Sequence, residues 1–293
     1  MKPLSLADRF FVLQARTLER AALRFVAPQR ILRVLFALIA RIGGRLPRGM
    51  IPIRDRHGAL WFRPDAVARD APVILYIHGG GFTIGGPRTH AALVGALAKA
   101  AGMRAVAASY RLAPEHPFPA ARDDAIATYA RLVEAGTPPI AIAGDSAGGC
   151  LSLSVLQHAR DMGWPLPKAA CLIAPIGDLS GSVEARFGEA ENEILIPPQW
   201  PARIREVYLR GLDPTAPEIS PLLGDLSGLP PTLIQAATGE ALAQDSARIV
   251  AAMDDATLDL WPGLQHVWHL HAGRAPVADR AIAQLADFIK SHA

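Results

Sequence analysis

Two short glycine-rich segments, each directly after a run of apolar residues, most constrain the fold of this 293-residue chain. The first is His78-Gly79-Gly80-Gly81, which follows the apolar run Val73–Ile77. The second has the sequence Gly-Asp-Ser-Ala-Gly-Gly over residues 144–149, and it follows Ile140–Ala143. A short apolar run that is partly β-branched is typical of a buried strand. Both glycine segments are therefore expected at the ends of strands.

The second segment places Ser146 at the centre of a Gly-x-Ser-x-Gly pentapeptide. On a strand-to-helix turn, this pattern holds the serine in a tight and strained backbone bend. Gly144 and Gly148 are expected because strand and helix approach closely there, which leaves no room for a Cβ. A helix over 147–161 would then direct its N-terminal dipole at Ser146. A glycine turn without chemistry is the alternative interpretation of the pentapeptide alone.

The first segment supplies the complementary part of an acyl-transfer site. The backbone N–H groups of Gly80, Gly81 and Ala147 are predicted to stabilise the negative charge on a carbonyl oxygen under attack. His78 stands at a strand end, so we expect it to orient this loop by hydrogen bonding and not to act as the base. A merely flexible loop is disfavoured because the glycines directly follow a strong strand signal.

The chain alternates between strand and helix patterns after about residue 50. Strands are predicted over Ile51–Ile53, Leu60–Arg63, Val73–Ile77, Arg104–Ser109, Ile140–Ala143, Ala169–Ile173, Thr232–Ala236 and Leu258–Trp261. Helices are predicted over Thr89–Ala101, Pro119–Ala135, Ala147–Asp161, Ala241–Met253 and Ala275–His292. Repeated βα units favour an α/β fold with a mostly parallel central sheet flanked by helices on both faces.

From about Gly58 to its C-terminus, the chain resembles the bacterial hormone-sensitive-lipase-like (family IV) esterases of the α/β-hydrolase superfamily. The matching segments are 78–82, 110–120, 144–149, 178–179, 220–222, 229–232 and 261–268. The resemblance implies an α/β-hydrolase catalytic domain over 51–293. It further implies a helical cap formed by residues 1–50 and by about 181–212. It also implies hydrolysis of esters with short to medium acyl chains, and no cofactor.

A serine nucleophile needs a base and an orienting carboxylate, which follow it in the order acid and then histidine in α/β-hydrolases. The family's base occupies the loop before a Val-Trp pair, so His266 is the predicted base and His269 the runner-up. Glu240 stands where the family commonly has aspartate and is the predicted acid, although its extra methylene requires a compensating backbone shift. Asp245, at the start of the next predicted helix, remains the alternative acid.

Other polar residues of the motifs are predicted to be structural. Glu115 and His116, in a rigid turn between prolines, are expected to tie down the oxyanion loop. Asp145 is expected to bond backbone amides, and Asp178 to stabilise the loop that follows it.

The charge balance is uneven along the chain. The formal net charge is only +3, from 30 basic and 27 acidic residues, which gives no signature of a nucleic-acid partner. The first 50 residues, however, carry ten Lys/Arg, Lys2 among them, against Asp8 and Glu19, a local charge of +8. This basic segment is interpreted as a solvated face, with attraction to an anionic substrate or a membrane surface as the alternative.

Other protein classes are disfavoured by what the chain contains. The longest apolar run near the start, Val34–Ala40, is too short to span a bilayer and too deep for a signal peptide, which favours a cytoplasmic protein without stable membrane insertion. Cys150 and Cys171 are too few for a disulfide framework and are expected to be buried thiols. Neither a metal-ligand spacing nor a phosphate-binding loop is found in the sequence.

The leading hypothesis is a serine carboxylesterase that works through an acyl-enzyme intermediate on a small-molecule ester. The alternatives are a non-catalytic ligand-binding protein on the same fold, or an amidase or lactonase. A homodimer is possible. The candidates for an apolar acyl pocket are Phe10, Phe11, Phe25, Phe36, Phe187, Trp200 and Tyr208.

Overall fold

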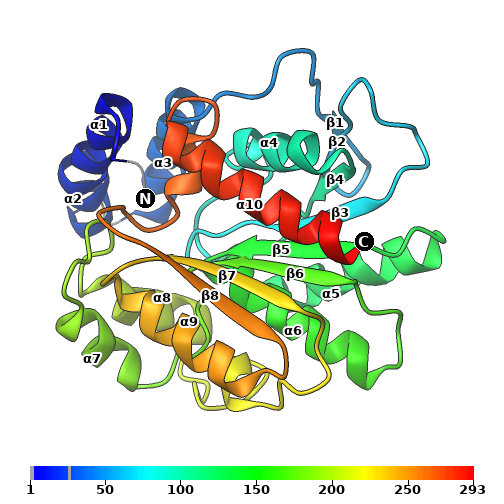
Figure 1. Cartoon of the computed structure of the whole chain (residues 1–293). Coiled ribbons are helices and arrows are strands. Elements are labelled where there is room, and N and C mark those ends of the chain that lie inside the picture. Colours follow the sequence, from blue (N-terminus) through cyan, green and yellow to red (C-terminus); the bar gives the residue numbers. More distant parts are fainter. Residues whose placement is uncertain (1–2, 26–27) are drawn as a thin grey trace.

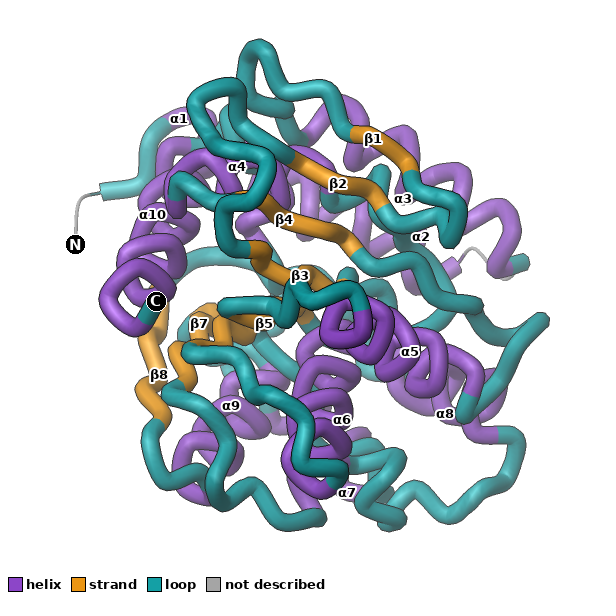
Figure 2. Tube along the Cα trace, turned by 90° about the vertical axis from the view of Figure 1, so that its right-hand side faces the viewer, coloured by secondary structure: helices purple, strands orange, loops and turns teal. Residues whose placement is uncertain are grey.

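The computed structural model describes residues 3–25 and 28–293, so the basic residue Lys2 lies outside them. At its centre lies one eight-stranded sheet with the strand order β1-β2-β4-β3-β5-β6-β7-β8. The strands are β1 (Ile53–Arg54), β2 (Leu60–Phe62), β3 (Val73–Ile77), β4 (Arg104–Ala107), β5 (Ala141–Asp145), β6 (Ala169–Ile173), β7 (Thr232–Ala237) and β8 (Ala256–Trp261). The pairs β1–β2 and β2–β4 are antiparallel and the other five are parallel. The predicted mostly parallel sheet is therefore confirmed, with β1 and β8 at opposite edges (Figure 2).

Helices cover both faces of the sheet (Figure 1). One face carries α4 (Ala91–Ala101) and α10 (Pro276–His292), which contact each other. The other face carries α5 (Ala120–Glu134), α6 (Ala147–Asp161) and α9 (Ala241–Ala252). Alternate residues of one strand enter two separate buried clusters: Leu75 of β3 packs on the α6 side, and Tyr76 packs on the α4 side. This is why the parallel strands read as continuous apolar runs.

The strand ends differ slightly from the predicted ones. The edge strand β1 begins at Ile53 and not at Ile51, whose side chain is exposed. Strand β4 ends at Ala107, two residues before the predicted Ser109. Strand β8 begins at Ala256, earlier than predicted, because this edge strand exposes part of its side chains and so lacks the apolar signal of a buried strand.

The two predicted cap segments are mainly helical. Residues 1–50 contain α1 (Leu6–Gln14), a π-helical turn η1 (Ala15–Glu19), α2 (Arg20–Phe25) and α3 (Gln29–Gly43). The second segment contains α7 (Ser182–Glu189) and α8 (Trp200–Leu209). Short 3-10 helices η2 (Pro221–Leu223) and η3 (Trp268–His271) complete the fold. Among the described residues, no helix is both long and apolar enough to cross a membrane.

Candidate active site

Ser146 occupies a sharp turn between β5 and α6. Its φ of 51° and ψ of −119° lie where residues other than glycine are rarely found, which confirms the predicted strained bend. A Cβ on Gly144 would lie 2.5 Å from the carbonyl oxygen of Gly148 and from Oγ of Ser152. A Cβ on Gly148 would collide with the carbonyl oxygen of Ile77 on the neighbouring strand β3. The predicted close approach of strand and helix is thus confirmed.

The loop after β3 needs glycine for its backbone. Gly80 and Gly81 have φ values of 113° and 56°, which side-chain-bearing residues rarely adopt. His78 Nδ1–H donates to the carbonyl of Gly79 at 2.9 Å, as predicted for an orienting residue. Burial, with the neighbouring His90, lowers the pKa of His78 to about 3, so its ring is uncharged at neutral pH.

Asp145, the residue before the serine, connects the two glycine segments. Its Oδ1 accepts the backbone N–H of Gly79 at 3.0 Å and the hydroxyl of Tyr76 at 2.7 Å, while Oδ2 lies 3.3 Å from Nε2 of His90. Burial alone would raise the pKa of Asp145, but His90 and the hydrogen bonds lower it to about 2. The carboxylate therefore holds the glycine loop after β3 against the Ser146 turn, and the predicted bond to a backbone amide is confirmed.

Arg33 of α3 ties the N-terminal helices to this loop. Its guanidinium donates to the carbonyl oxygens of Thr83 and Ala113 at 2.7 and 2.8 Å. It also binds both carboxylate oxygens of Glu115, at 3.1 and 2.6 Å. Glu115 thus contacts the loop indirectly, because it binds the guanidinium of Arg33, which in turn binds the loop. The sequence did not predict this role of Arg33. For His116, only the backbone N–H has a described hydrogen bond, within its own turn.

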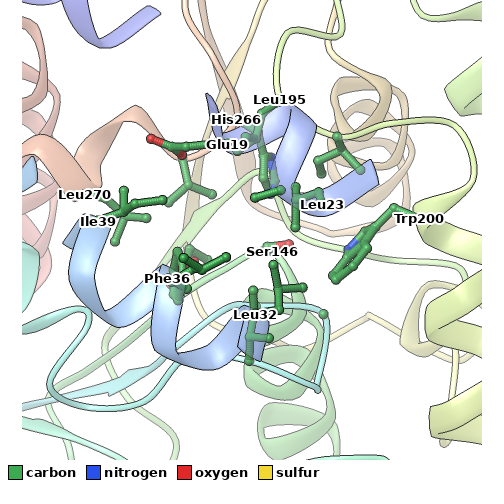
Figure 3. A pocket seen from close by; sticks show the side chains of 18 of the residues that line it. Glu19, Leu23, Leu32, Phe36, Ile39, Ser146, Leu195, Trp200, His266 and Leu270 are labelled. Carbon is green, nitrogen blue, oxygen red and sulfur yellow. The ribbon is translucent and has the colours of Figure 1, made fainter. Parts of the chain in front are cut away.

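Glu240 and His266 form a buried pair. Nδ1 of His266 lies 2.6 Å from Oε2 of Glu240, and Oε1 of Glu240 accepts the backbone N–H of Ala237 at 2.6 Å. Nε2 of His266 has no hydrogen-bond partner among residues 3–25 and 28–293. His266 and Ser146 line one pocket (Figure 3).

Two effects oppose each other on the pKa of His266. Burial lowers it, whereas the charge and hydrogen bond of Glu240, followed by the charges of Glu193 and Asp145, raise it. The net result is a pKa above the ordinary value of 6.5. An imidazole in this position can hold a proton more firmly than in water, as a base for a serine hydroxyl requires.

The two alternative residues lie in other environments. Asp245 forms a 2.8 Å ion pair with Nε of Arg186 and accepts the backbone N–H of Gly177 at 2.9 Å. Nε2 of His269 lies 2.8 Å from Oε1 of Gln235, and burial lowers the pKa of His269 to about 3. Neither residue is among those that line the described pocket. Geometry therefore favours Glu240 and His266 over Asp245 and His269.

Asp178 binds the loop that follows it, and both cysteines are buried, as predicted. Oδ1 of Asp178 accepts the backbone N–H of Ser180 at 2.8 Å, and its other oxygen lies 2.9 Å from Arg248. Cys150 and Cys171 are both buried free thiols.

The pocket above Ser146 is mostly apolar. The space between its walls, with the open solvent at its mouth included, measures about 810 Å³. Its apolar walls come from α2, α3, the loop after β3, the segment before α8 with the start of α8, and the region from the loop after β8 into η3 (Figure 3). They consist of Ala22, Leu23, Leu32, Leu35, Phe36, Ile39, Ile84, Leu195, Ile196, Trp200, Val267 and Leu270. Gly80 and Gly81 form part of the same lining, next to Ser146.

Of the seven aromatic candidates for the acyl pocket, Phe36 and Trp200 line it. The remaining five are corrected by the structure. Phe10 and Phe25 are exposed, because they lie on the outer sides of their helices. Phe11 stacks on His271 and Tyr208 stacks on Phe82, whereas Phe187 is buried in the main core. The sequence shows that these residues are aromatic and lie in segments expected to be helical, but it does not show which side of each helix faces the pocket.

Two glutamates near the pocket carried no sequence signal. Glu19 ends the π-helical turn and lines the pocket, with Gln14 Nε2 donating to it at 2.8 Å. Glu193 accepts the backbone N–H groups of Leu195 and Ile196 at 3.0 and 2.8 Å, and that of Ala241 at 3.2 Å. Glu193 thus fastens the pocket wall to the residue directly after Glu240. Within the described part of the chain, no group of three His, Cys, Asp or Glu residues could hold a metal ion.

The sheet order and the sharp turn at Ser146 between β5 and α6 are those of the α/β-hydrolase class. The family described as alpha/beta hydrolase fold matches residues 74–270. An acetyl-hydrolase of Streptomyces hygroscopicus is 41% identical over 252 residues, which are 84% of each chain. The structure of an esterase from the bacterial hormone-sensitive lipase family is 34% identical with a TM-score of 0.88, over 100% of this chain and 99% of that one.

Another solved structure, EstE5 soaked with p-nitrophenyl butyrate, is 32% identical with a TM-score of 0.81 and covers 91% of this chain and 92% of its own. The chain therefore belongs to the α/β-hydrolase family and, within it, to the bacterial hormone-sensitive-lipase-like esterases. It is a carboxylesterase of this group.

Proposed function

We propose that Ser146, His266 and Glu240 form the catalytic triad of this carboxylesterase. Oγ of Ser146 attacks the ester carbonyl carbon while Nε2 of His266 accepts the hydroxyl proton. Glu240 keeps the proton of the neutral ring on Nδ1 through the 2.6 Å contact and stabilises the imidazolium that forms. The observation that carries this assignment is that Nε2 of His266 is left without a described partner in the pocket that Ser146 lines.

The N–H groups of Gly80, Gly81 and Ala147 stabilise the oxyanion in this proposal. Gly80 and Gly81 line the pocket, and Ala147 begins α6, where the first N–H groups of a helix have no partner within the helix. Losing one such donor typically costs about 10²–10³ in turnover. The collapsing intermediate expels the alcohol, which takes the proton from His266, and water then hydrolyses the acyl-serine by the same steps.

The substrates are proposed to be esters of short to medium acyl chains. The apolar walls around Ser146 offer an acyl chain a place to bury its methylene groups, each worth about 0.8 kcal/mol. The relative EstE5 was soaked with a butyrate ester, which makes that length a reasonable starting point. Residues 1–50 and about 181–212 act as a cap that limits the length of chain accepted. A cytoplasmic location and a homodimer remain predictions.

The decisive experiment compares the wild type with Ser146→Ala on p-nitrophenyl esters from acetate to laurate. We expect a pre-steady-state burst of p-nitrophenol from the wild type, highest kcat/KM for the shorter chains, and activity near background for the variant. A fluorophosphonate probe should label the wild type and leave Ser146→Ala unlabelled. A wild type that neither hydrolyses these esters nor reacts with the probe would indicate a non-catalytic binding protein.

A further inference from the structure

Helix α3 is apolar on two sides, and the pocket accounts for one of them. Phe36 and Ile39 point from α3 toward Ser146, together with their neighbour Leu32 (Figure 3). A second row of large apolar side chains on α3 stays in solvent. This outer stripe consists of Ile31, Val34, Leu38 and Ile42, whose exposed fractions are 53, 59, 53 and 70%.

The spacing of the outer stripe makes it one continuous surface. Its members stand three, seven and eleven residues after the first, which places them in one row along an α-helix. Isolated exposed apolar residues are common on proteins, but a contiguous row of them marks an interaction surface. The row borders the pocket side of the same helix, since Leu35 and Ile39 continue the apolar arc into the pocket.

The charged side chains that α3 itself contributes are all positive. Arg30 and Arg41 lie on the flank of the stripe away from the pocket, and both are exposed. The only described acidic contact of Arg30 is a long one, 3.7 Å to Glu115, a carboxylate already bound by Arg33. Helix α3 contains no acidic residue, and the first 50 residues carry a net charge of +8. A partner for this surface must therefore combine negative charge with apolar depth.

We propose that the outer stripe of α3 docks on an anionic lipid surface, with its apolar side chains among the acyl chains and its flanking arginines against the headgroups. With 15 residues α3 is too short to span a bilayer, so it would lie in the plane of the interface. A second copy of the chain paired through antiparallel α3 helices fits less well, because this twofold arrangement sets the same patch against itself and brings the arginine flanks together.

The test measures vesicle binding of the full chain by co-sedimentation without any ester, so its outcome does not depend on catalysis. Vesicles of pure phosphatidylcholine are compared with an equal mixture of phosphatidylcholine and phosphatidylglycerol. We expect binding to the mixed vesicles alone, and its loss at high salt because screening weakens the headgroup contacts. Arg30→Gln/Arg41→Gln should bind about 25-fold more weakly, at about fivefold for each arginine removed.

The apolar part is tested by Val34→Gln/Leu38→Gln, which keeps good helix formers at exposed positions. We expect at least a tenfold loss of vesicle binding, because both substitutions reduce the apolar area that the stripe can bury in the lipid. The matched control is Met162→Gln/Leu223→Gln, two exposed apolar residues outside α3, which should bind like the wild type. Hydrolysis of soluble p-nitrophenyl butyrate at wild-type rate shows that each variant is folded.

Three results would overturn the proposal. The first is no binding of the wild type to the mixed vesicles at low salt. The second is equal binding by the stripe variant and the control. The third is a dimer, seen by light scattering, that becomes monomeric in Val34→Gln/Leu38→Gln while vesicle binding stays unchanged, which would identify a second copy as the occupant.

Discussion

Replacing Glu240 by glutamine keeps the size of the side chain but gives it one hydrogen-bond acceptor and one donor group in place of two acceptors. In the wild type, Oε1 accepts from the N–H of Ala237 while Oε2 faces Nδ1 of His266. The amide oxygen of glutamine satisfies Ala237 only if its NH₂ faces Nδ1. Nδ1 must then be the acceptor, and the ring proton moves to Nε2. In that tautomer, His266 cannot take the proton of Ser146.

The structure sets the order of effects expected at this position. A wrong tautomer of this kind costs about 10⁴ in kcat, or about 5 kcal/mol of transition-state stabilisation. Glu240→Asp keeps the charge but withdraws the carboxylate by about 1.5 Å, so the 2.6 Å contact opens to about 4 Å, beyond hydrogen-bonding range. A misplacement of that size costs about 10²-fold. Glu240→Gln, whose side chain has the size of glutamate, is thus expected to lose more kcat than the shorter Glu240→Asp.

The assay is kcat on p-nitrophenyl butyrate, with melting temperature as a check on folding. The matched control is Asp245→Asn, which removes one partner of the buried ion pair with Arg186. It should destabilise the protein by about 3–5 kcal/mol while kcat at low temperature stays near that of the wild type. The reasoning would be refuted by a large loss of kcat in Asp245→Asn together with a mild effect of Glu240→Gln, or by aspartate being worse than glutamine at position 240.

Three further outcomes are expected. Since His266 must be neutral to act and its pKa is raised, kcat/KM should fall as the pH drops through a value above 6.5. Glu193→Gln removes a charge that raises this pKa, so the acidic limb of the pH profile should move to lower pH. An acidic limb at the wild-type pH would show that Glu193 does not act on the base. Gly79→Ala should lower kcat by about 10²-fold, because its Cβ collides with Oδ2 of Asp145 and displaces the oxyanion loop; a wild-type kcat would contradict this contact. Arg33→Met removes the hydrogen bonds from α3 to the carbonyl oxygens of Thr83 and Ala113. The melting temperature should therefore fall by about 2–4 °C for each kcal/mol of stability lost with these bonds. An unchanged melting temperature would contradict a stabilising role for Arg33.

The local backbone requirements of the site could be predicted from the sequence. Gly80 and Gly81 adopt positive φ values, and Gly144 leaves space between strand and helix, so the identity of these residues follows from sterics within a few positions along the chain. The strands next to them are buried on both faces, which is why their apolar runs could be recognised. For these reasons, the Ser146 turn and the sheet class needed no tertiary information.

The choice between Glu240 and Asp245 depended on the tertiary structure. Both follow β7 within a few residues, and what separates them is direction: Gly239, with a φ of 82°, precedes Glu240, whose side chain meets His266, while Asp245 meets Arg186 of α7. The pocket wall shows the same dependence, since Phe36 faces Ser146 while an equally apolar Phe10 faces solvent. Contacts between segments far apart in the chain decide such directions, because many side-chain orientations are locally equivalent until packing removes all but one.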